Sequence, residues 1–362
     1  MLGEVWVCSG QSNMEMSVNW NIINGEEEAA KANYPNIRIF HVQKIGAEYP
    51  QQNCNATWTK CTPETMRTTS AVGYFFAREL MQKLNVPVGI IVSAWSGTPA
   101  EVWIEKSHLE NEQILNELEN FDNFVGWPRT PGVLYNSMIA PIVPYGKAGA
   151  IWYQGEANCG NYQIYSSLMK TLIENWRTEF KKDFPFYLVQ IAPFNYGDMG
   201  TSQYIREQQE IVSKTVPNTG MVVISDLVDN IKDIHPKDKL NVGKRLAKYA
   251  LAETYQQNVG AYKSPSFESM KIEKNKVQIR FSNAAAGLKY AGKNPSKFLI
   301  SGDDQNFVLA IAKIEGNTVI LSAKTVKTPV AVRFCFDNTS MPDVFSTEGL
   351  PLAPFRTDRW NK

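Results

Sequence analysis

The feature that most constrains the fold is a series of short, nearly continuous apolar segments that recur between longer amphipathic stretches. Six such segments are rich in β-branched residues, and they lie at residues 4–8, 37–42, 88–93, 148–154, 186–192 and 221–226. Strands that are apolar on both faces are typical of parallel sheets covered by helices on both sides. Helical patterns alternate with them, at residues 70–84, 161–180, 202–215 and 237–255. The chain therefore predicts an α/β fold with a mostly parallel sheet.

The pattern changes after about residue 258, where alternating apolar and polar residues replace the helical periodicity. The stretch "FVLAIAKIEGNTVILSAKTV" shows this alternation, with "EGN" as a turn signal, and it predicts antiparallel strands. We therefore expect an α/β domain over residues 1–258 and a smaller β-rich region over residues 259–362. The length of 362 residues suits two parts, since single cores stop growing near about 250 to 300 residues.

Charge and hydropathy argue against two classes of partner. The 37 lysines and arginines nearly cancel the 36 acidic residues, and no basic stripe occurs, so we expect no nucleic-acid partner. The longest apolar runs, such as residues 86–95, reach about half of the ~20 residues that a membrane span needs, so we expect a soluble protein. The chain shows no signal peptide and reaches its first core strand within three residues, as if upstream residues had been removed.

The cysteines and histidines argue against a metal site. Five cysteines without a C-x-x-C spacing favour neither a zinc ribbon nor a dense disulfide framework, although Cys54 and Cys61 could pair in an oxidising compartment. Cys8 is interpreted as a core residue. Because the three histidines are scattered and no carboxylates cluster, we expect no metal and no other cofactor.

The stretch "VWVCSGQSNMEM" places Ser12 just after the first predicted strand, and two interpretations of this serine stand side by side. Ser12 and Glu15 have the spacing of a capping box, in which the serine caps a helix. Alternatively, Ser12 is a nucleophile at the carboxyl end of a parallel strand, where a backbone N–H at a helix start can stabilise an oxyanion. The two roles are compatible.

A nucleophilic serine needs a base, normally a histidine, and the chain offers three. His41 lies within a strand-like segment, and His108 lies among charged residues at an expected helix start. His235 instead follows the sixth predicted strand in the polar loop "DLVDNIKDIHPKDK", where Pro236 disfavours helical geometry at the histidine. His235 is therefore the candidate base, against the alternative of a surface loop histidine.

Two further polar loops follow predicted strands. In "SAWSGTPAEVW" Gly97 would let a backbone N–H approach a ligand closely. In "IWYQGEANCGN" the side chains of Gln154, Glu156 and Asn158 offer amide and carboxylate groups. The Gln154 amide is a candidate oxyanion donor, although such loop residues also bond to their own backbone. Four polar loops at one sheet edge favour a site there.

These motifs resemble the sialate O-acetylesterases of the SGNH hydrolase superfamily, which are related to carbohydrate acetylxylan esterases. The resemblance spans nearly the whole chain and rests on "VWVCSGQSNM", "SAWSGTPAEVW", "LYNSMIAPIVPYGKAGAIWYQGEAN", "DIHPKDK" and "EGLPLAPFRTDRW". It implies a three-layer, flavodoxin-like SGNH hydrolase fold. It also implies a serine esterase that removes O-acetyl groups from a carbohydrate substrate, with Ser12 as nucleophile and His235 as base.

The resemblance further implies an oxyanion hole formed by the backbone N–H groups of Ser12 and Gly97 and by the Gln154 side chain, with Asn158 competing for the side-chain role. The superfamily commonly has an aspartate three residues before the histidine, where this chain has Lys232. Our first choice for orienting His235 is therefore Asp233. The alternatives are Asp226, Asp229, Glu156 and a main-chain carbonyl near Lys232.

The expected substrate is O-acetylated sialic acid, bound by Glu156. Four aromatic residues could flank the sugar or could equally be core residues: Trp95, Trp152, Tyr153 and Trp103, with core favoured for Trp103. An acetylxylan esterase is the alternative within the enzyme class. A non-catalytic carbohydrate-binding protein, in which Ser12 only caps its helix, is the alternative outside it. Relatives usually carry an upstream β-rich segment and secretion signals, which implies a periplasmic or secreted setting.

Overall fold

The computed structural model describes residues 2–109, 114, 118, 127–197, 200–292 and 295–360. A seven-stranded sheet forms the centre of the larger, N-terminal part of the molecule. The strand order is β3-β2-β4-β1-β5-β6-β7, and all neighbours are parallel except β3, which runs antiparallel to β2. The strands are β1 (Glu4–Gly10), β2 (Tyr34–His41), β3 (Trp58–Cys61), β4 (Val88–Ala94), β5 (Gly149–Tyr153), β6 (Phe186–Val189) and β7 (Thr219–Val222).

The strand order confirms the predicted flavodoxin-like fold. Strands β4-β1-β5-β6-β7 reproduce the flavodoxin order 2-1-3-4-5, and β2 and β3 extend the β4 edge. In this order the chain continues to one side of β1 first and crosses to β5 afterwards, so the topological switch point lies between β1 and β5. Ligands of open α/β sheets bind outside the carboxyl ends of the strands at such a point.

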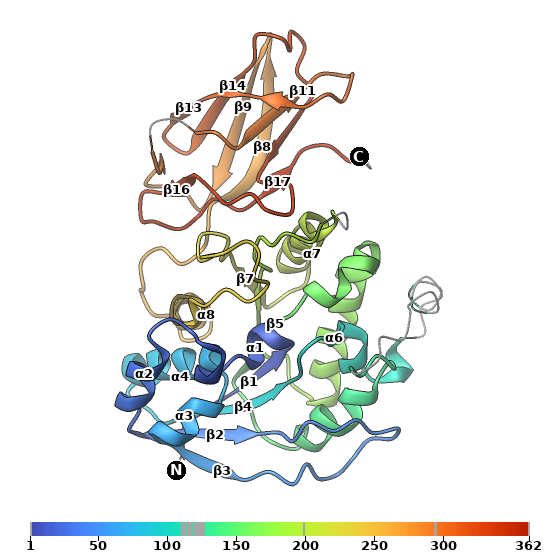
Figure 1. The fold of residues 1–362 in the computed structure, drawn as a ribbon, viewed down its shortest axis with the longest axis vertical. Coiled ribbons are helices and arrows are strands. Elements are labelled where there is room, and N and C mark those ends of the chain that lie inside the picture. The colour runs from blue at the N-terminus through green and yellow to red at the C-terminus, as the bar shows by residue number, and fades with distance from the viewer. Residues whose placement is uncertain are drawn as a thin grey trace.

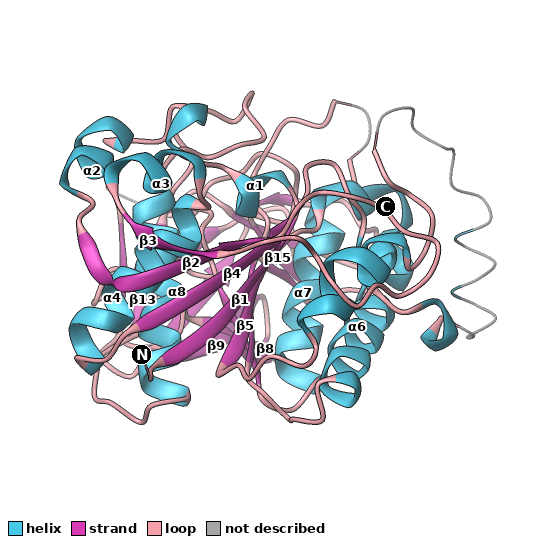
Figure 2. Ribbon diagram, turned by 90° about the horizontal axis from the view of Figure 1, so that it is seen from below, coloured by secondary structure: helices cyan, strands magenta, loops and turns pink. Residues whose placement is uncertain are grey.

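Helices cover both faces of the sheet, as Figure 2 shows. Helices α4 and α8 pack together on one face with a core that includes Trp6 and Tyr187, and α6 and α7 cover the other face with Trp152 and Trp176. The helices are α1 (Ser12–Glu15), α2 (Gly25–Lys31), α3 (Pro63–Thr68), α4 (Ala71–Leu84), α6 (Tyr165–Glu179), α7 (Ser202–Thr215) and α8 (Lys239–Glu253). No helix within the described part of the chain is long and apolar enough to cross a membrane.

The C-terminal region consists of antiparallel strands with a core of their own and stands at one end of the molecule (Figure 1). Its strands are β8 (Ser266–Glu273), β9 (Lys276–Ser282), β10 (Leu288–Tyr290), β11 (Phe298–Ser301), β12 (Val308–Leu309), β13 (Ile311–Glu315), β14 (Thr318–Ser322), β15 (Ala331–Phe334), β16 (Val344–Ser346) and β17 (Phe355–Arg356). Arg356 donates two hydrogen bonds to Glu207 of α7, at 2.7 and 2.8 Å. The predicted boundary at residue 258 falls between α8 and β8, and a division into two folding units there stays a prediction.

All five cysteines are free thiols in the structure, so Cys54 and Cys61 are not joined. Cys8 is fully buried, as predicted, and burial raises the pKa of its thiol. Cys61, Cys159 and Cys335 are buried as well, whereas Cys54 is partly exposed.

Candidate active site

The loops that follow β1, β4, β5 and β7 enclose a cavity of about 340 Å³ at the switch point. The register explains why three of them begin at one level, because Gly10 at the end of β1 pairs with both Ala94 of β4 and Tyr153 of β5. The described residues that line the cavity are Gln11, Ser12, Trp20, Ser96, Gly97, Trp127, Arg129, Glu156, Ala157, Ile234 and His235. The structure therefore brings Ser12, Gly97, Glu156 and His235 together, as the sequence predicts.

Ser12 is the first residue of α1 and does not cap it. The N-cap position belongs to Gln11, which makes no side-chain capping bond. Glu15 instead pairs with Lys44 and accepts hydrogen bonds from the backbone N–H and hydroxyl of Ser96, at 2.7 and 2.9 Å. The capping-box interpretation is therefore wrong. The Ser12 hydroxyl makes no hydrogen bond with a described residue and lies in the cavity wall.

Gly97 follows β4 with a left-handed backbone (φ +69°), a conformation that side chains other than hydrogen rarely allow. A Cβ atom here would lie 2.6 Å from the ring of Trp127. The backbone N–H groups of Ser12 and Gly97 both donate to no described acceptor. Both residues line the cavity, so their N–H groups are candidate donors of an oxyanion hole.

His235 lies in the loop between β7 and α8, and its imidazole lines the same cavity as Ser12 without a hydrogen bond between the two. The backbone N–H of His235 donates to Asp233 Oδ1 at 3.0 Å, and the imidazole Nδ1 is 3.6 Å from the same oxygen. The Trp20 and His235 rings make a T-shaped contact, with ring centroids 5.4 Å apart. Burial and the charge of Lys239 lower the pKa of His235, and Asp233 opposes this shift. This direction favours the neutral imidazole, which is the form that a general base requires.

The alternatives to Asp233 have other contacts or other positions. Both carboxylate oxygens of Asp226 accept hydrogen bonds from Arg245 at 2.6 Å. Glu156 Oε1 accepts from Asn13 at 2.7 Å. Of the acidic side chains discussed, only that of Asp233 lies within 4 Å of the His235 ring nitrogens.

Gln154 and Asn158 lie beneath the cavity, fully buried, and do not line it. The Gln154 amide donates to Thr98 O at 3.3 Å and to Asn158 Oδ1 at 2.7 Å. The Asn158 amide donates to Glu101 Oε2 at 2.9 Å and to Asn161 Oδ1 at 3.1 Å. Since each amide already donates to two acceptors, neither side chain offers a hydrogen to an oxyanion in this arrangement. The two amides instead fix the loop after β5.

The aromatic residues predicted to flank a sugar are placed differently by the structure. Trp152 and Tyr153 are fully buried on opposite faces of β5, so the expectation that they contact substrate is wrong. Trp103 is a core residue as predicted, and Trp95 is half-buried against the same core without lining the cavity. The aromatic rings of the cavity wall come from Trp20 and Trp127, 37% and 43% exposed, which sequence analysis missed. Residues 121–126, which precede Trp127, lie outside the described residues.

The cavity is also lined by two ionisable side chains, those of Arg129 and Glu156. Arg129 is the one arginine or lysine among the described lining residues, and its charge also acts on the buried carboxyl group of Glu101. Glu156 Oε2 is buried with no described donor, and burial raises the pKa of this carboxyl group. Arg129 was not singled out from the sequence, whereas Glu156 was.

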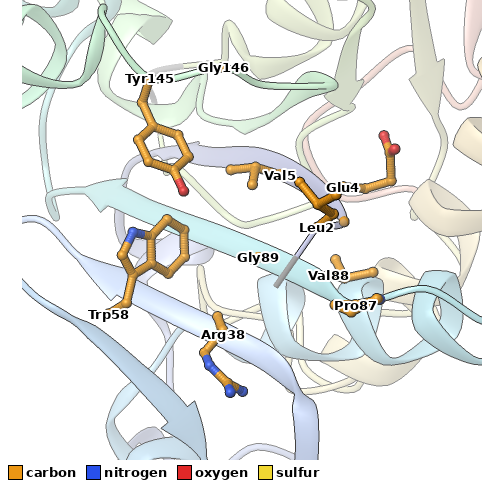
Figure 3. Close-up of a pocket in the computed structure, with 11 residues that line it drawn as sticks. Leu2, Glu4, Val5, Arg38, Trp58, Pro87, Val88, Gly89, Tyr145 and Gly146 are labelled. Atoms are coloured by element: carbon orange, nitrogen blue, oxygen red, sulfur yellow. The ribbon is translucent and has the colours of Figure 1, made fainter.

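A larger cavity of about 430 Å³ lies at the other end of the strands, near the starts of β1 and β4 (Figure 3). Trp58, Tyr145 and Arg38 line it together with the residues before β1 and β4. It contains no serine, cysteine or histidine among its described lining residues. It also lies at the amino ends of the parallel strands, so the smaller cavity, at their carboxyl ends, is the candidate active site.

The histidines other than His235 lie elsewhere. His41 ends β2 and does not line the cavity. His108 ends a short helical turn, where its Nε2 atom is 3.6 Å from Glu105 and 3.9 Å from Glu179. The structure thus leaves His235 as the histidine beside Ser12.

Comparisons with known proteins agree with this architecture. A family model described as carbohydrate esterase, sialic acid-specific acetylesterase, matches residues 2–252. Sialate O-acetylesterase of Homo sapiens is 30% identical over 400 residues, which cover 98% of this chain and 75% of the human protein. The rat (Rattus norvegicus) protein of the same name is 32% identical over 321 residues, covering 73% of this chain and 59% of the relative. A solved carbohydrate acetylesterase from Xanthomonas citri superposes with a TM-score of 0.89 at 34% identity, over 99% of this chain and 81% of that chain.

Proposed function

We propose that Ser12 and His235 form the catalytic pair of this chain. The premise is that the chain belongs to the carbohydrate esterase, sialic acid-specific acetylesterase family. As a member of this family the chain is a carboxylic ester hydrolase that removes O-acetyl groups from sugars. The observation that carries the assignment is that the Ser12 hydroxyl and the His235 imidazole, from distant parts of the chain, line one cavity at the switch point.

The proposed reaction proceeds through an acyl-enzyme. His235 takes the proton of the Ser12 hydroxyl as its oxygen attacks the acetyl carbonyl carbon, and the N–H groups of Ser12 and Gly97 bind the resulting oxyanion. The sugar oxygen leaves with the proton from His235, and the acetyl group stays on Ser12. Water, deprotonated by His235, then attacks the acetyl-serine and releases acetate. Asp233 stabilises the imidazolium that forms in each half of the reaction.

The proposed substrate is O-acetylated sialic acid, an acidic sugar. Arg129 can pair with its carboxylate, since a guanidinium and a carboxylate make charge-assisted hydrogen bonds. Glu156 lines the same cavity and can offer its carboxyl group to a sugar hydroxyl. The exposed rings of Trp20 and Trp127 provide apolar surface for the sugar ring. An acetylated xylan lacks the carboxylate, so the arginine favours the acidic sugar. The expected setting, periplasmic or secreted, rests on the family resemblance alone.

The test is release of acetate from O-acetylated sialic acid, acetylated xylan and p-nitrophenyl acetate by the wild type and Ser12→Ala. We expect the wild type to prefer acetylated sialic acid and Ser12→Ala to lose activity at least 1,000-fold, as removal of a serine nucleophile does. Ser213→Ala, a helical serine outside the cavity, is the matched control and should keep full activity. Turnover by a folded Ser12→Ala protein would refute the nucleophile. Binding without turnover by the wild type would indicate a carbohydrate-binding protein.

A further inference from the structure

We propose that Asn13, Glu156 and Lys239 form a buried positioning network that holds the nucleophile, the β5 loop and the histidine loop in one arrangement. This inference rests on the proposed function of Ser12 and His235. Asn13 follows the nucleophile directly, Glu156 lies in the loop after β5, and Lys239 is the first residue of α8, four positions after His235. The three residues thus come from the elements that deliver the reacting groups.

The contacts of Asn13 join these elements. Its amide nitrogen donates to Glu156 Oε1 at 2.7 Å and to the backbone oxygen of Ile234 at 3.1 Å. Its amide oxygen accepts from Lys239 Nζ at 2.7 Å. Since Ile234 precedes His235, a rotation of the Asn13 side chain would release the histidine loop as well as the β5 loop. Asn13 is fully buried, so water cannot replace these bonds without opening the site.

Lys239 is an unusual residue for its position. Its side chain is 1% exposed, although lysine is almost never fully buried without a partner. It also lies in the first turn of α8, where the helix dipole disfavours a cation. Burial lowers the pKa of Lys239 to about 7, and the nearby carboxylates of Glu156, Asp233, Asp238 and Asp229 oppose that shift. A buried charge of this kind costs stability, and such groups cluster at functional sites.

Lys239 also acts electrostatically on His235. The charged and titratable groups around the imidazole are Asp233 from its own loop, Lys239 from α8, and Glu156 and Arg129 on the cavity wall. Trp20 covers the ring with an uncharged indole. Burial has the largest influence on the pKa of His235. The charge of Lys239, which lowers this pKa, comes second, and the charge of Asp233, which raises it, comes third. The network therefore positions the histidine loop and favours the unprotonated imidazole.

The experiment compares Lys239→Met with Lys248→Met, an exposed lysine of the same helix, and with Lys239→Arg, which keeps the charge. We expect Lys239→Met to lower kcat for p-nitrophenyl acetate by about 10- to 100-fold, the cost of a small misplacement of reacting groups. The acid limb of kcat/KM should move to higher pH by on the order of half a unit, because a neighbouring cation is lost. Lys239→Arg should keep the wild-type acid limb, and Lys248→Met should match the wild type throughout.

The same shift is measurable without turnover, because the chain has only three histidines and the His235 resonance can be assigned by its absence from a His235→Ala variant. A folded Lys239→Met protein with the wild-type His235 titration and kcat would overturn the proposal. If Lys239→Met does not fold, Asn13→Ala tests the same network, since it deletes the bonds to Glu156, Ile234 and Lys239 but keeps the Glu156 and Lys239 side chains. A folded Asn13→Ala with unchanged kcat would also overturn it. A wrong assignment of Ser12 as nucleophile would be detected separately, because the Ser12→Ala protein would then still turn over p-nitrophenyl acetate.

Discussion

Asp233→Asn measures how much the acidic residue beside His235 contributes to the reaction. Asp233 Oδ1 is 3.6 Å from His235 Nδ1, too far for a good hydrogen bond but close enough for a charge interaction with the imidazolium. Two unit charges at this distance interact by about 1 kcal/mol in water and by about 4 to 5 kcal/mol at an effective dielectric constant of 20. The side chains are 36% and 28% exposed, so solvent screening favours the lower end, about 1 to 2 kcal/mol.

This energy predicts a 5- to 30-fold loss of kcat for Asp233→Asn. Asparagine keeps the oxygen that accepts the His235 backbone N–H at 3.0 Å, so the loop conformation should persist. The expected loss is far below the roughly 10,000-fold effect of the buried aspartate of a serine protease triad. The assay is p-nitrophenyl acetate hydrolysis from pH 5 to 8.

The sign of the accompanying pH effect is fixed by the structure. The charge of Asp233 raises the pKa of His235, so its removal should move the acid limb of kcat/KM to lower pH. This direction is opposite to that expected for Lys239→Met. A loss above 1,000-fold would refute the screening argument, and a rate within twofold of the wild type would mean that His235 is oriented without Asp233.

Two further substitutions test the cavity wall. Gly97→Ala should lower kcat at least 10-fold, since the new Cβ would lie 2.6 Å from the Trp127 ring at a left-handed backbone position. The same strain should destabilise the fold by roughly 1 to 2 kcal/mol in thermal unfolding. An unchanged kcat would show that the Gly97 N–H is not part of the oxyanion hole. Arg129→Met should reduce the preference for acetylated sialic acid over its methyl ester by about 10- to 100-fold, because hydrogen bonds to charged groups contribute about 1.5 to 3 kcal/mol. The preference is measured as the ratio of the two kcat/KM values. An unchanged ratio would mean that another group recognises the carboxylate.

The sheet and the meeting of Ser12 with His235 were predictable because both follow from strand pattern and connectivity. Buried strands are apolar on both faces, and the carboxyl ends of parallel strands share one edge, so loops from distant parts of the chain converge there. Strand β3 escaped prediction because Trp58–Cys61 contains a threonine and a lysine and has no apolar run.

The direction of individual side chains in the loop after β5 was not predictable. Gly155 turns the chain sharply (φ +158°), so that Gln154 points beneath the cavity and Glu156 lines it. The burial of Trp152 and Tyr153 does follow from the strand pattern, because a strand covered on both faces exposes neither of two successive residues. Trp20 ends a three-residue helical turn (Val18–Trp20) and Trp127 lies in a loop, and both segments are too short or too irregular for periodicity to indicate which side chains reach a cavity.

The buried position of Lys239 could not be predicted from the sequence. A lysine in the first turn of an amphipathic helix is expected on the surface. Here its ammonium group is stabilised by the hydrogen bond to Asn13, by nearby carboxylates such as that of Glu156 and by the ring of Tyr153. The two charges near His235 then act unequally, since Asp233 is half-exposed and screened whereas Lys239 is buried. In a triad with a buried aspartate, one residue both orients the histidine and stabilises its charge. Here the roles divide: the buried network orients the loop, and the solvent-facing aspartate supplies a weaker charge, so orientation and charge stabilisation should respond to separate substitutions.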